Sequence, residues 1–228
     1  LQDWRPVASP GTKEDGTTKD DCNVKLNAEQ SSLYRALTAR CNYLCTDRPD
    51  IAFATKELAR MMSAPTRGGW EKLKRLGRYL SGHTRLICWF EWQREVESIQ
   101  VYTDSDWAGC KSTRKSTSGG CILRGKHLLK SWSKNQGLVA LSSGEAELYA
   151  VVKATAEGMG MQSILKDLGQ VVEGHIWADA SAALGIINRR GLGKVRHIDV
   201  AELWLQEKVD EGKFKVLKIK GKDNVADA

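Results

Sequence analysis

The stretch IQVYTDSDWAG, residues 99–109, places two carboxylates at the end of a strand-like segment. Apolar Ile99 and Val101 alternate with polar residues, which is the two-residue period of a β-strand. Strands disfavour aspartate, yet this one runs into Asp104 and Asp106. Side chains two apart on a strand share a face, so both acids could point the same way. Their mutual repulsion requires a compensating partner.

Further acids follow other predicted elements of the same sheet. Asp179 lies in the strand-like segment HIWADA, which comes after a long predicted helix, SSGEAELYAVVKATAEGMGMQSILKDLG. A helical crossover makes the two strands parallel, and sites in open α/β sheets form where such strands end. The first turn of the helix carries Glu145 and Glu147, and helical geometry does not choose between them because they lie about 200° apart. A fourth acid, Asp227, follows the last predicted strand.

Three or four carboxylates that converge on one point repel each other by several kcal/mol in a site of low dielectric constant. Divalent cations remove this repulsion, and ligation by oxygen alone suits Mg²⁺, with Mn²⁺ as a substitute. Two such ions about 4 Å apart activate a water and stabilise a leaving oxygen in phosphodiester cleavage. Any single aspartate at a strand end is more often a turn or capping residue. The metal hypothesis therefore depends on all four acids fitting one topology.

The elements that must position these acids form an α/β pattern. Residues 96–228 contain strand-like and helical segments in the order β-β-β-α-β-α-α-β. This order predicts a mixed five-stranded sheet with helices on both faces. The segment RLICWFEW, residues 85–92, also reads as a strand.

The sequence before the sheet differs in composition and in hydrophobic pattern. Residues 1–30 are polar and predict a flexible lead-in. Residues 31–95 contain three helical patterns, which predict a small packed helical unit. The first helix is expected to bury a stripe that includes Leu33, Leu37 and Leu44.

Composition narrows the class of protein. The formal net charge of +7 favours a polyanionic partner such as nucleic acid. The six cysteines form no C-x-x-C pair and read as reduced thiols of an intracellular protein. No apolar run of the length needed to span a membrane occurs. The chain begins with Leu1 and stops at Ala228, so we expect it to be part of a longer protein.

Three motifs, YTDSDWAG, RKSTSGG and SWSKNQGLVALSSGEAELYA, closely resemble the ribonuclease H domain of copia-type LTR retrotransposon Pol polyproteins. The segment YRALTARCNYLCTDRPDIAFATKELARMMSAPT resembles the thumb and connection tail of their reverse transcriptase. The resemblance covers about residues 31–228. It implies a ribonuclease H fold that hydrolyses the RNA strand of RNA–DNA hybrids with Mg²⁺. It also implies association with the remainder of the Pol polyprotein, in a cytoplasmic virus-like particle or in the nucleus.

Carried over by motif, the catalytic and metal-binding acids of that family fall on Asp104, Glu147, Asp179 and Asp227. Asp106 belongs to the D-x-D-W-A-G motif, as a metal ligand or as a turn residue. Cellular ribonucleases H carry a histidine before the last aspartate, and KIKGKDNVADA has none. The chain ends one residue after Asp227, so we expect the helix that would hold this carboxylate to be truncated.

Residues expected to bind the substrate lie in two segments. The first, RKSTS, contributes cations and hydroxyls that suit phosphates: Arg114, Lys115, Ser116, Thr117 and Ser118. The second, NRRGLGKVRH, contributes Arg190, Arg196 and His197, the last at the entry to a helix. Basic runs are also common on solvated faces and edge strands. Trp107 and Trp132 are further candidates for nucleic-acid contact, with a core role as the alternative.

Three functions remain open at this point. The first is a metal-dependent endonuclease specific for RNA–DNA hybrids. The second is an inactive nucleic-acid-binding or structural module from a decayed or domesticated element. The third is another polynucleotidyl transferase of the same fold. The Y-x-D-D signature of polymerases does not occur, so this segment has no polymerase site of its own.

Overall fold

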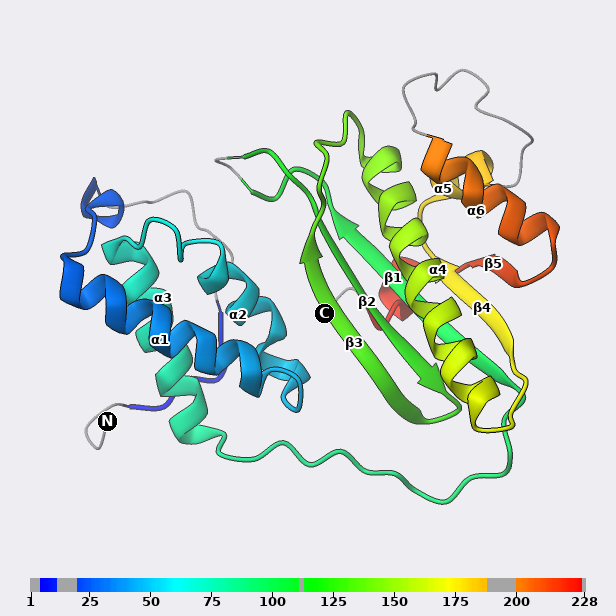
Figure 1. Ribbon diagram of the computed structural model, residues 1–228, viewed down its shortest axis with the longest axis horizontal. Helices are drawn as coiled ribbons and strands as arrows, with labels where there is room; N and C mark the ends of the chain where they lie inside the picture. Colours follow the sequence, from blue (N-terminus) through cyan, green and yellow to red (C-terminus); the bar gives the residue numbers. More distant parts are fainter. Residues whose placement is uncertain (1–4, 12–19, 111–112, 188–199, 227–228) are drawn as a thin grey trace. The chain divides into compact units, whose positions relative to one another are not determined.

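The computed structural model describes residues 5–11, 20–110, 113–187 and 200–226. The chain consists of two compact units, Leu1–Cys88 and Trp89–Ala228 (Figure 1). The domain boundary expected between residues 95 and 96 stays a prediction. Within the described residues, no helix is both long and apolar enough to cross a membrane.

The first unit contains three α-helices: α1 (Ala28–Leu44), α2 (Ala52–Ala59) and α3 (Arg67–Gly82). Asn27 and Thr66 cap α1 and α3 by accepting backbone N–H bonds from Gln30 and Gly69, as short polar side chains do at helix starts. Their shared core contains Tyr34, Ile51, Ala54, Leu58, Leu73, Leu76 and Tyr79.

The buried stripe of α1 differs from the predicted one. Leu37, Cys41 and Cys45 pack against the core as the stripe predicts. Ser31, Tyr34 and Thr38 are buried, whereas Leu33 and Leu44 are exposed. The hydroxyl of Tyr34 donates to the Leu58 carbonyl oxygen at 2.8 Å. This bond satisfies the polar tip of Tyr34 in the core, so the larger aromatic side chain is buried in place of the leucines.

The strand predicted at residues 85–92 is wrong, because this segment forms no ladder with any described strand. Side chains hold its end instead. The amide of Gln93 donates to the Arg124 carbonyl oxygen at 2.9 Å and accepts from the Lys126 backbone N–H at 2.9 Å. Strand propensity reflects packing on a pleated surface, and the apolar side chains Trp89 and Trp92 have no such surface and stay exposed.

The second unit is built on a five-stranded sheet. Its strands are β1 (Ser98–Asp106), β2 (Thr117–Arg124), β3 (His127–Asn135), β4 (Glu173–Ala178) and β5 (Phe214–Lys218). The spatial order is β3-β2-β1-β4-β5, with β1, β2 and β3 antiparallel and with β4 and β5 parallel to β1. The predicted mixed five-stranded sheet with helices is confirmed.

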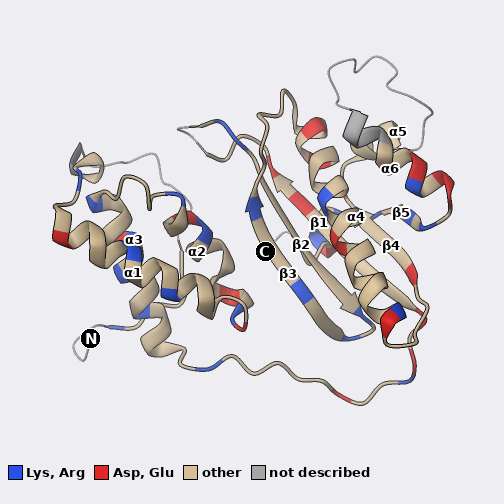
Figure 2. Cartoon of the chain, in the orientation of Figure 1, with Lys and Arg blue, Asp and Glu red and all other residues tan. Residues whose placement is uncertain are grey.

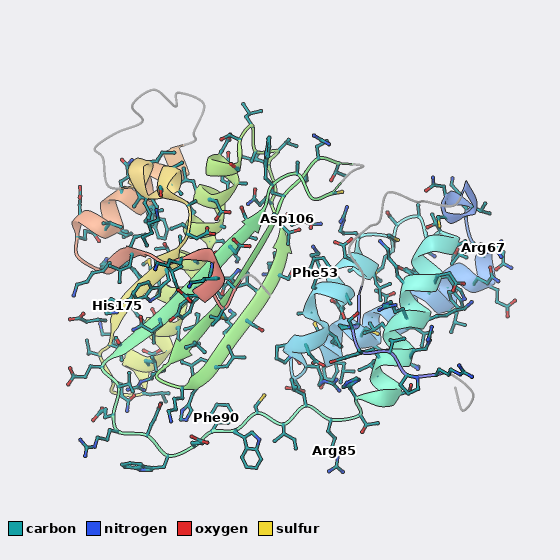
Figure 3. All side chains as sticks on the ribbon, turned by 180° about the vertical axis from the view of Figure 1, so that it is seen from behind. Phe53, Arg67, Arg85, Phe90, Asp106 and His175 are labelled. Atoms are coloured by element: carbon teal, nitrogen blue, oxygen red, sulfur yellow. The ribbon has the colours of Figure 1, made fainter. Side chains whose placement is uncertain are left out.

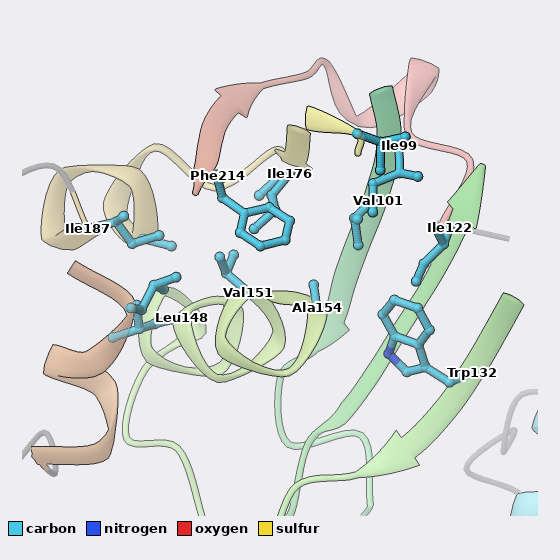
Figure 4. Packing of buried hydrophobic residues seen from close by; sticks show 14 of the residues in the cluster. Ile99, Val101, Ile122, Trp132, Leu148, Val151, Ala154, Ile176, Ile187 and Phe214 are labelled. Carbon is cyan, nitrogen blue, oxygen red and sulfur yellow. The ribbon is translucent and has the colours of Figure 1, made fainter. Parts of the chain in front are cut away.

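The helices of this unit are α4 (Ser143–Asp167), α5 (Ser181–Ile187) and α6 (Val200–Asp210). Side chains of all three helices join one core with the inward residues of the strands, including Val101, Ile122 and Ile176 (Figure 4). The ring of Phe214 lies so close to Gly158 and Gly174 that a Cβ atom at either position would overlap it. These glycines let β5, β4 and α4 pack tightly.

The opposite face of the sheet, turned to the viewer in Figure 3, carries the short 3₁₀-helix η3 (Gly221–Asp223). Tyr102 and Trp177 stack their rings with centroids 6.2 Å apart. The buried Asn224 donates from its side chain to the Thr103 carbonyl oxygen at 3.1 Å. This bond ties the C-terminal segment to β1, one residue before Asp104.

Candidate metal centre

Two of the predicted acids lie where adjacent parallel strands end. Asp104 is near the carboxyl end of β1, and Asp179 immediately follows β4. The parallel register pairs Tyr102 with Trp177, so each acid follows its paired residue by two positions. Figure 2 shows the acidic colouring at this end of β1.

The first turn of α4 resolves the choice between its two glutamates. Ser142 caps the helix by accepting from the Glu145 backbone N–H, and the Glu145 carboxylate accepts from the Leu141 backbone N–H at 2.8 Å. This arrangement is a variant of the capping box, in which the glutamate reaches the backbone N–H of the residue before the N-cap serine. Glu145 is thereby committed to the helix start, and Glu147 is the acid that faces the strand ends.

Asp104, Glu147 and Asp179 come together in the structure. Each offers a carboxylate oxygen, and these oxygens all lie within 4.8 Å of one another. Three separate elements, β1, α4 and the end of β4, supply them. Carboxylates this close repel strongly unless a proton or a cation intervenes.

Asp106 does not belong to this group. Its carboxylate accepts a short hydrogen bond from the Thr117 backbone N–H and fills the space beside Gly109. Asp106 therefore holds the turn that connects β1 to β2, which is the turn role considered from the sequence.

Burial dominates the electrostatics of Glu147. The side chain is 8% exposed, and this burial raises the pKa of Glu147 from its ordinary value of 4.5 to about 7. The negative charges of Asp104 and Asp179 contribute to this rise in pKa, and a hydrogen bond from Ser105 opposes it. Near neutral pH, Glu147 exchanges readily between its protonated and ionised forms.

The residues present fit a divalent cation. Oε2 of Glu147 is buried and has no hydrogen-bond partner among the described residues. A buried acceptor without a donor is costly, and a cation in place of the donor removes that cost. The donor set consists of carboxylates alone, which matches the hard oxygen ligation of Mg²⁺ or Mn²⁺.

The fourth predicted acid, Asp227, lies outside the described residues. The chain before it reaches the same part of the sheet, since a Cβ atom placed on Gly119 would lie 3.6 Å from the Ala226 carbonyl oxygen. Gly119 of β2 is the register partner of Asp104. The described segment thus ends beside the strand pair that carries Asp104.

The predicted hydroxyl contacts have internal partners. Ser116, Thr117 and Ser118 are buried. The Ser116 hydroxyl accepts from the Ala108 backbone N–H at 3.0 Å, and the Ser118 hydroxyl accepts from the Gln136 side chain at 3.0 Å. These hydroxyls hold the strand ends together, and their contact with phosphates stays a prediction.

The predicted cations divide into two sets. Arg114 and Lys115 lie in the connection between β1 and β2, where Arg114 is exposed with a φ of 57°. Arg190, Arg196 and His197 lie outside the described residues. Of the two tryptophans considered for nucleic-acid contact, Trp132 is buried in the core and Trp107 is exposed.

Comparison with known proteins identifies the relatives. No family model matches the chain. A retrovirus-related Pol polyprotein from transposon TNT 1-94 of Nicotiana tabacum is 34% identical over 234 residues, which cover 100% of this chain. One from transposon RE2 of Arabidopsis thaliana is 31% identical over 227 residues, or 98% of the chain. This chain is a homologue of part of a retrovirus-related Pol polyprotein.

The chain spans only a small part of these Pol relatives, 17% of the tobacco polyprotein and 15% of the Arabidopsis polyprotein. Among solved structures, LC11-RNase H1 in complex with an RNA/DNA hybrid is similar at 18% identity and a TM-score of 0.40. That similarity covers 56% of this chain and 89% of the solved one.

Two further residues were not predicted: Ser105 contacts the acidic cluster, and Gln136 contacts the part of α4 that carries Glu147. The Ser105 hydroxyl donates to Oε1 of Glu147 at 2.9 Å. The Gln136 amide donates to the Ala146 carbonyl oxygen at 2.8 Å, in the turn of α4 that carries Glu147. Ser105 could have been found from its place between two aspartates, whereas no local pattern distinguishes Gln136 from a loop residue.

Proposed function

We propose that this chain hydrolyses the RNA strand of RNA–DNA hybrids as the ribonuclease H part of a retrotransposon Pol polyprotein. The observation that carries the proposal is the convergence of Asp104, Glu147 and Asp179 at the strand ends. We propose that these residues, with Asp227 from outside the described part, hold two divalent ions, Mg²⁺ or in its place Mn²⁺. The homology to Pol polyproteins supports this assignment.

Each residue of the cluster has a definable task. Ser105 fixes Oε1 of Glu147 and leaves Oε2 directed away from that bond. Without an ion, Glu147 can hold a proton, because burial raises its pKa to about 7. Asp104 and Asp179 supply negative charge from the two strand ends. When bound, the divalent ions activate a water and stabilise the leaving oxygen of the RNA strand.

We propose a double-stranded hybrid as the substrate and the remainder of the Pol polyprotein as the partner. The net charge of +7 suits a polyanion. Arg114 and Lys115 lie in the β1–β2 connection, close in sequence to the strand end that carries Asp104. Phosphate contacts from these cations would set the position of the duplex but would not read its sequence.

A cleavage assay tests the proposal. A hybrid labelled on its RNA strand should be cut in Mg²⁺ or Mn²⁺ and spared in EDTA, while double-stranded DNA should stay intact. Asp104→Asn should abolish cleavage and leave hybrid binding in place. Asp167→Asn is the matched control, because it removes the same charge from an exposed position at the far end of α4.

Three results would contradict the proposal. Equal cleavage by the wild type and by Asp104→Asn would refute the site. Hybrid binding by the wild type without cleavage in either metal would indicate a binding module. Cleavage of double-stranded DNA would indicate another polynucleotidyl transferase of the same fold.

A further inference from the structure

An apolar surface lies at the same end of the sheet as the acidic cluster. It consists of Trp107, after β1, and three side chains of the connection between β3 and α4: Leu138, Val139 and Leu141. Their exposed fractions are 53%, 55%, 46% and 69% in that order. We call these four residues the apolar rim. Figure 3 labels Asp106, which immediately precedes Trp107, at this end of β1.

The rim is held in place by hydrogen bonds between its two loops. The indole Nε1 of Trp107 donates to the Ala140 carbonyl oxygen at 3.2 Å. The backbone N–H of Leu141 donates to the capping carboxylate of Glu145 at 2.8 Å. Both loops are therefore anchored while the apolar side chains stay in solvent, and such grouped exposure often marks an interaction surface.

The rim is connected directly to the elements that carry the candidate metal ligands. Trp107 comes three residues after Asp104 in the chain, and Leu141 lies just before α4, the helix that carries Glu147 near its start.

Two cations lie in the same connection as Trp107. Arg114 and Lys115 belong to the connection that leaves Trp107 and returns to β2. This connection is folded on itself, since the Arg114 N–H donates to the Cys110 carbonyl oxygen at 2.7 Å and the Cys110 N–H donates to that of Lys115 at 3.2 Å. Exposed apolar side chains and cations are thus found at the same end of the sheet, and this combination suits a nucleic-acid duplex.

We propose that the apolar rim packs into the minor groove of the hybrid, with Trp107 as its principal contact and with Arg114 and Lys115 on the flanking phosphates. An A-form-like duplex offers a wide, shallow minor groove lined by sugars and base edges. Apolar side chains can contact these edges there, and cations meet the backbone. This inference rests on the proposed function, because it takes the hybrid as the substrate.

Binding measured in the Asp104→Asn background tests the inference without cleavage. Anisotropy of a labelled hybrid is recorded over a range of salt concentrations. Trp107→Ala should weaken binding about tenfold, as loss of a large aromatic contact at an interface does, and equally at every salt concentration, because the lost contact releases no counterions. Lys115→Ala should instead lower the slope of log K against log salt by roughly 0.7 to 0.9, because one phosphate contact is lost.

Trp92→Ala is the matched control, since Trp92 is 86% exposed and adjoins Gln93, which contacts the β2–β3 turn at the other end of β3. It should leave affinity unchanged. Circular dichroism checks folding of each variant. Leu141→Ser, which keeps the backbone N–H of the capping box, should weaken binding several-fold and serves if Trp107→Ala does not fold.

The outcomes separate this inference from the proposed function. If the Asp104→Asn parent binds the hybrid no better than double-stranded DNA, the proposed substrate is wrong. If the parent prefers the hybrid but folded Trp107→Ala and Leu141→Ser bind as tightly as the parent, the rim inference alone is overturned. In that case, the rim would suit a protein partner rather than the duplex.

Discussion

The Ser105 hydroxyl donates a 2.9 Å hydrogen bond to the carboxylate of Glu147, which joins the end of β1 to the first turn of α4. The bond stabilises the ionised carboxylate and lowers the pKa of Glu147, whereas burial, the larger effect, raises it. These two contributions act in opposite directions on a residue that must be ionised to bind a cation.

Ser105→Ala should therefore shift the pH dependence of cleavage. Without the hydroxyl, burial is less opposed and the pKa of Glu147 rises above about 7. The acidic limb of the plot of cleavage rate against pH should move to higher pH. Relative to the wild type, the variant should lose more of its rate at pH 6 than on the alkaline plateau. Ser98→Ala, at the other end of β1, is the control. An unmoved acidic limb would show that the bond does not influence the ionisation of Glu147.

The raised pKa of Glu147 also predicts a pH dependence of stability without metal. Below its unfolded pKa of about 4.5, the buried carboxyl is protonated in both states and its stabilising contribution is fully present. That contribution is lost as pH rises through about 7, because ionisation in the folded protein is unfavourable. The shift corresponds to at most about 3 kcal/mol.

Glu147→Gln should remove this component. In EDTA, urea unfolding of the wild type at pH 5 and pH 8 should show a loss of stability at the higher pH that is smaller in the variant. Glu157 forms salt bridges with Lys130 and Lys153, and its pKa is lowered to about 2. Because Glu157 therefore stays ionised between pH 5 and pH 8, Glu157→Gln is a suitable control. Equal pH dependence of the wild type and Glu147→Gln would contradict the assignment.

Metal binding should stabilise the fold through the same cluster. A cation that binds only the folded state adds about 1.4 kcal/mol of stability at ten times its Kd. Mg²⁺ or Mn²⁺ should raise the Tm of the wild type and of Asp167→Asn, and should not raise that of Asp179→Asn. Calorimetric titration should give the same ranking. A similar rise in the Tm of Asp179→Asn would place the cation elsewhere.

The sequence predicted the sheet and the convergence of three acids because both follow from topology. Parallel strands joined by a helical crossover must end at one edge, and this places Asp104 near Asp179. The choice of Glu147 over Glu145 needed either a resemblance or the observed capping box, since the two first-turn acids differ only in the direction of their side chains.

Other features depend on tertiary contacts that periodicity does not encode. The segment 85–92 has the composition of a strand, but a strand also needs a neighbouring backbone, and here Gln93 anchors the chain by its side chain. Helix α1 buries Tyr34 rather than Leu33 because the tyrosine hydroxyl finds the Leu58 carbonyl across the core. Sequence patterns show which residues are apolar, whereas tertiary contacts such as the Tyr34–Leu58 bond decide which residues are buried.

Asp106 gives a prediction that separates the two roles of the acids. Its carboxylate binds the Thr117 N–H and lies against Gly109. Asp106→Ala should lower the free energy of unfolding by about 1 to 3 kcal/mol, because a backbone donor loses its partner, while Mg²⁺ affinity changes little. Asp104→Asn should instead weaken Mg²⁺ binding and change the free energy of unfolding little. Loss of metal binding in a folded Asp106→Ala protein would make Asp106 a ligand.

Gln136 connects the segment after β3 to β2 and to α4. Its side chain is buried and donates to the Ser118 hydroxyl and the Ala146 carbonyl oxygen, while its backbone N–H donates to the Ser116 carbonyl oxygen at 2.8 Å. The start of α4 is thereby fastened to β2 at Ala146, and Glu147 is the next residue along the helix.

Gln136→Leu keeps the approximate volume and removes both side-chain donors, so it should destabilise the fold by about 1 to 3 kcal/mol and weaken Mg²⁺ binding several-fold. Gln162→Leu is the matched control, because Gln162 makes one similar bond, to the Val172 carbonyl oxygen at 3.0 Å, from the far part of α4. It should cost stability without changing Mg²⁺ affinity. Because Gln136, unlike Gln162, contacts the part of α4 next to Glu147, equal effects of the two variants on Mg²⁺ binding would show that loss of stability alone weakens the site.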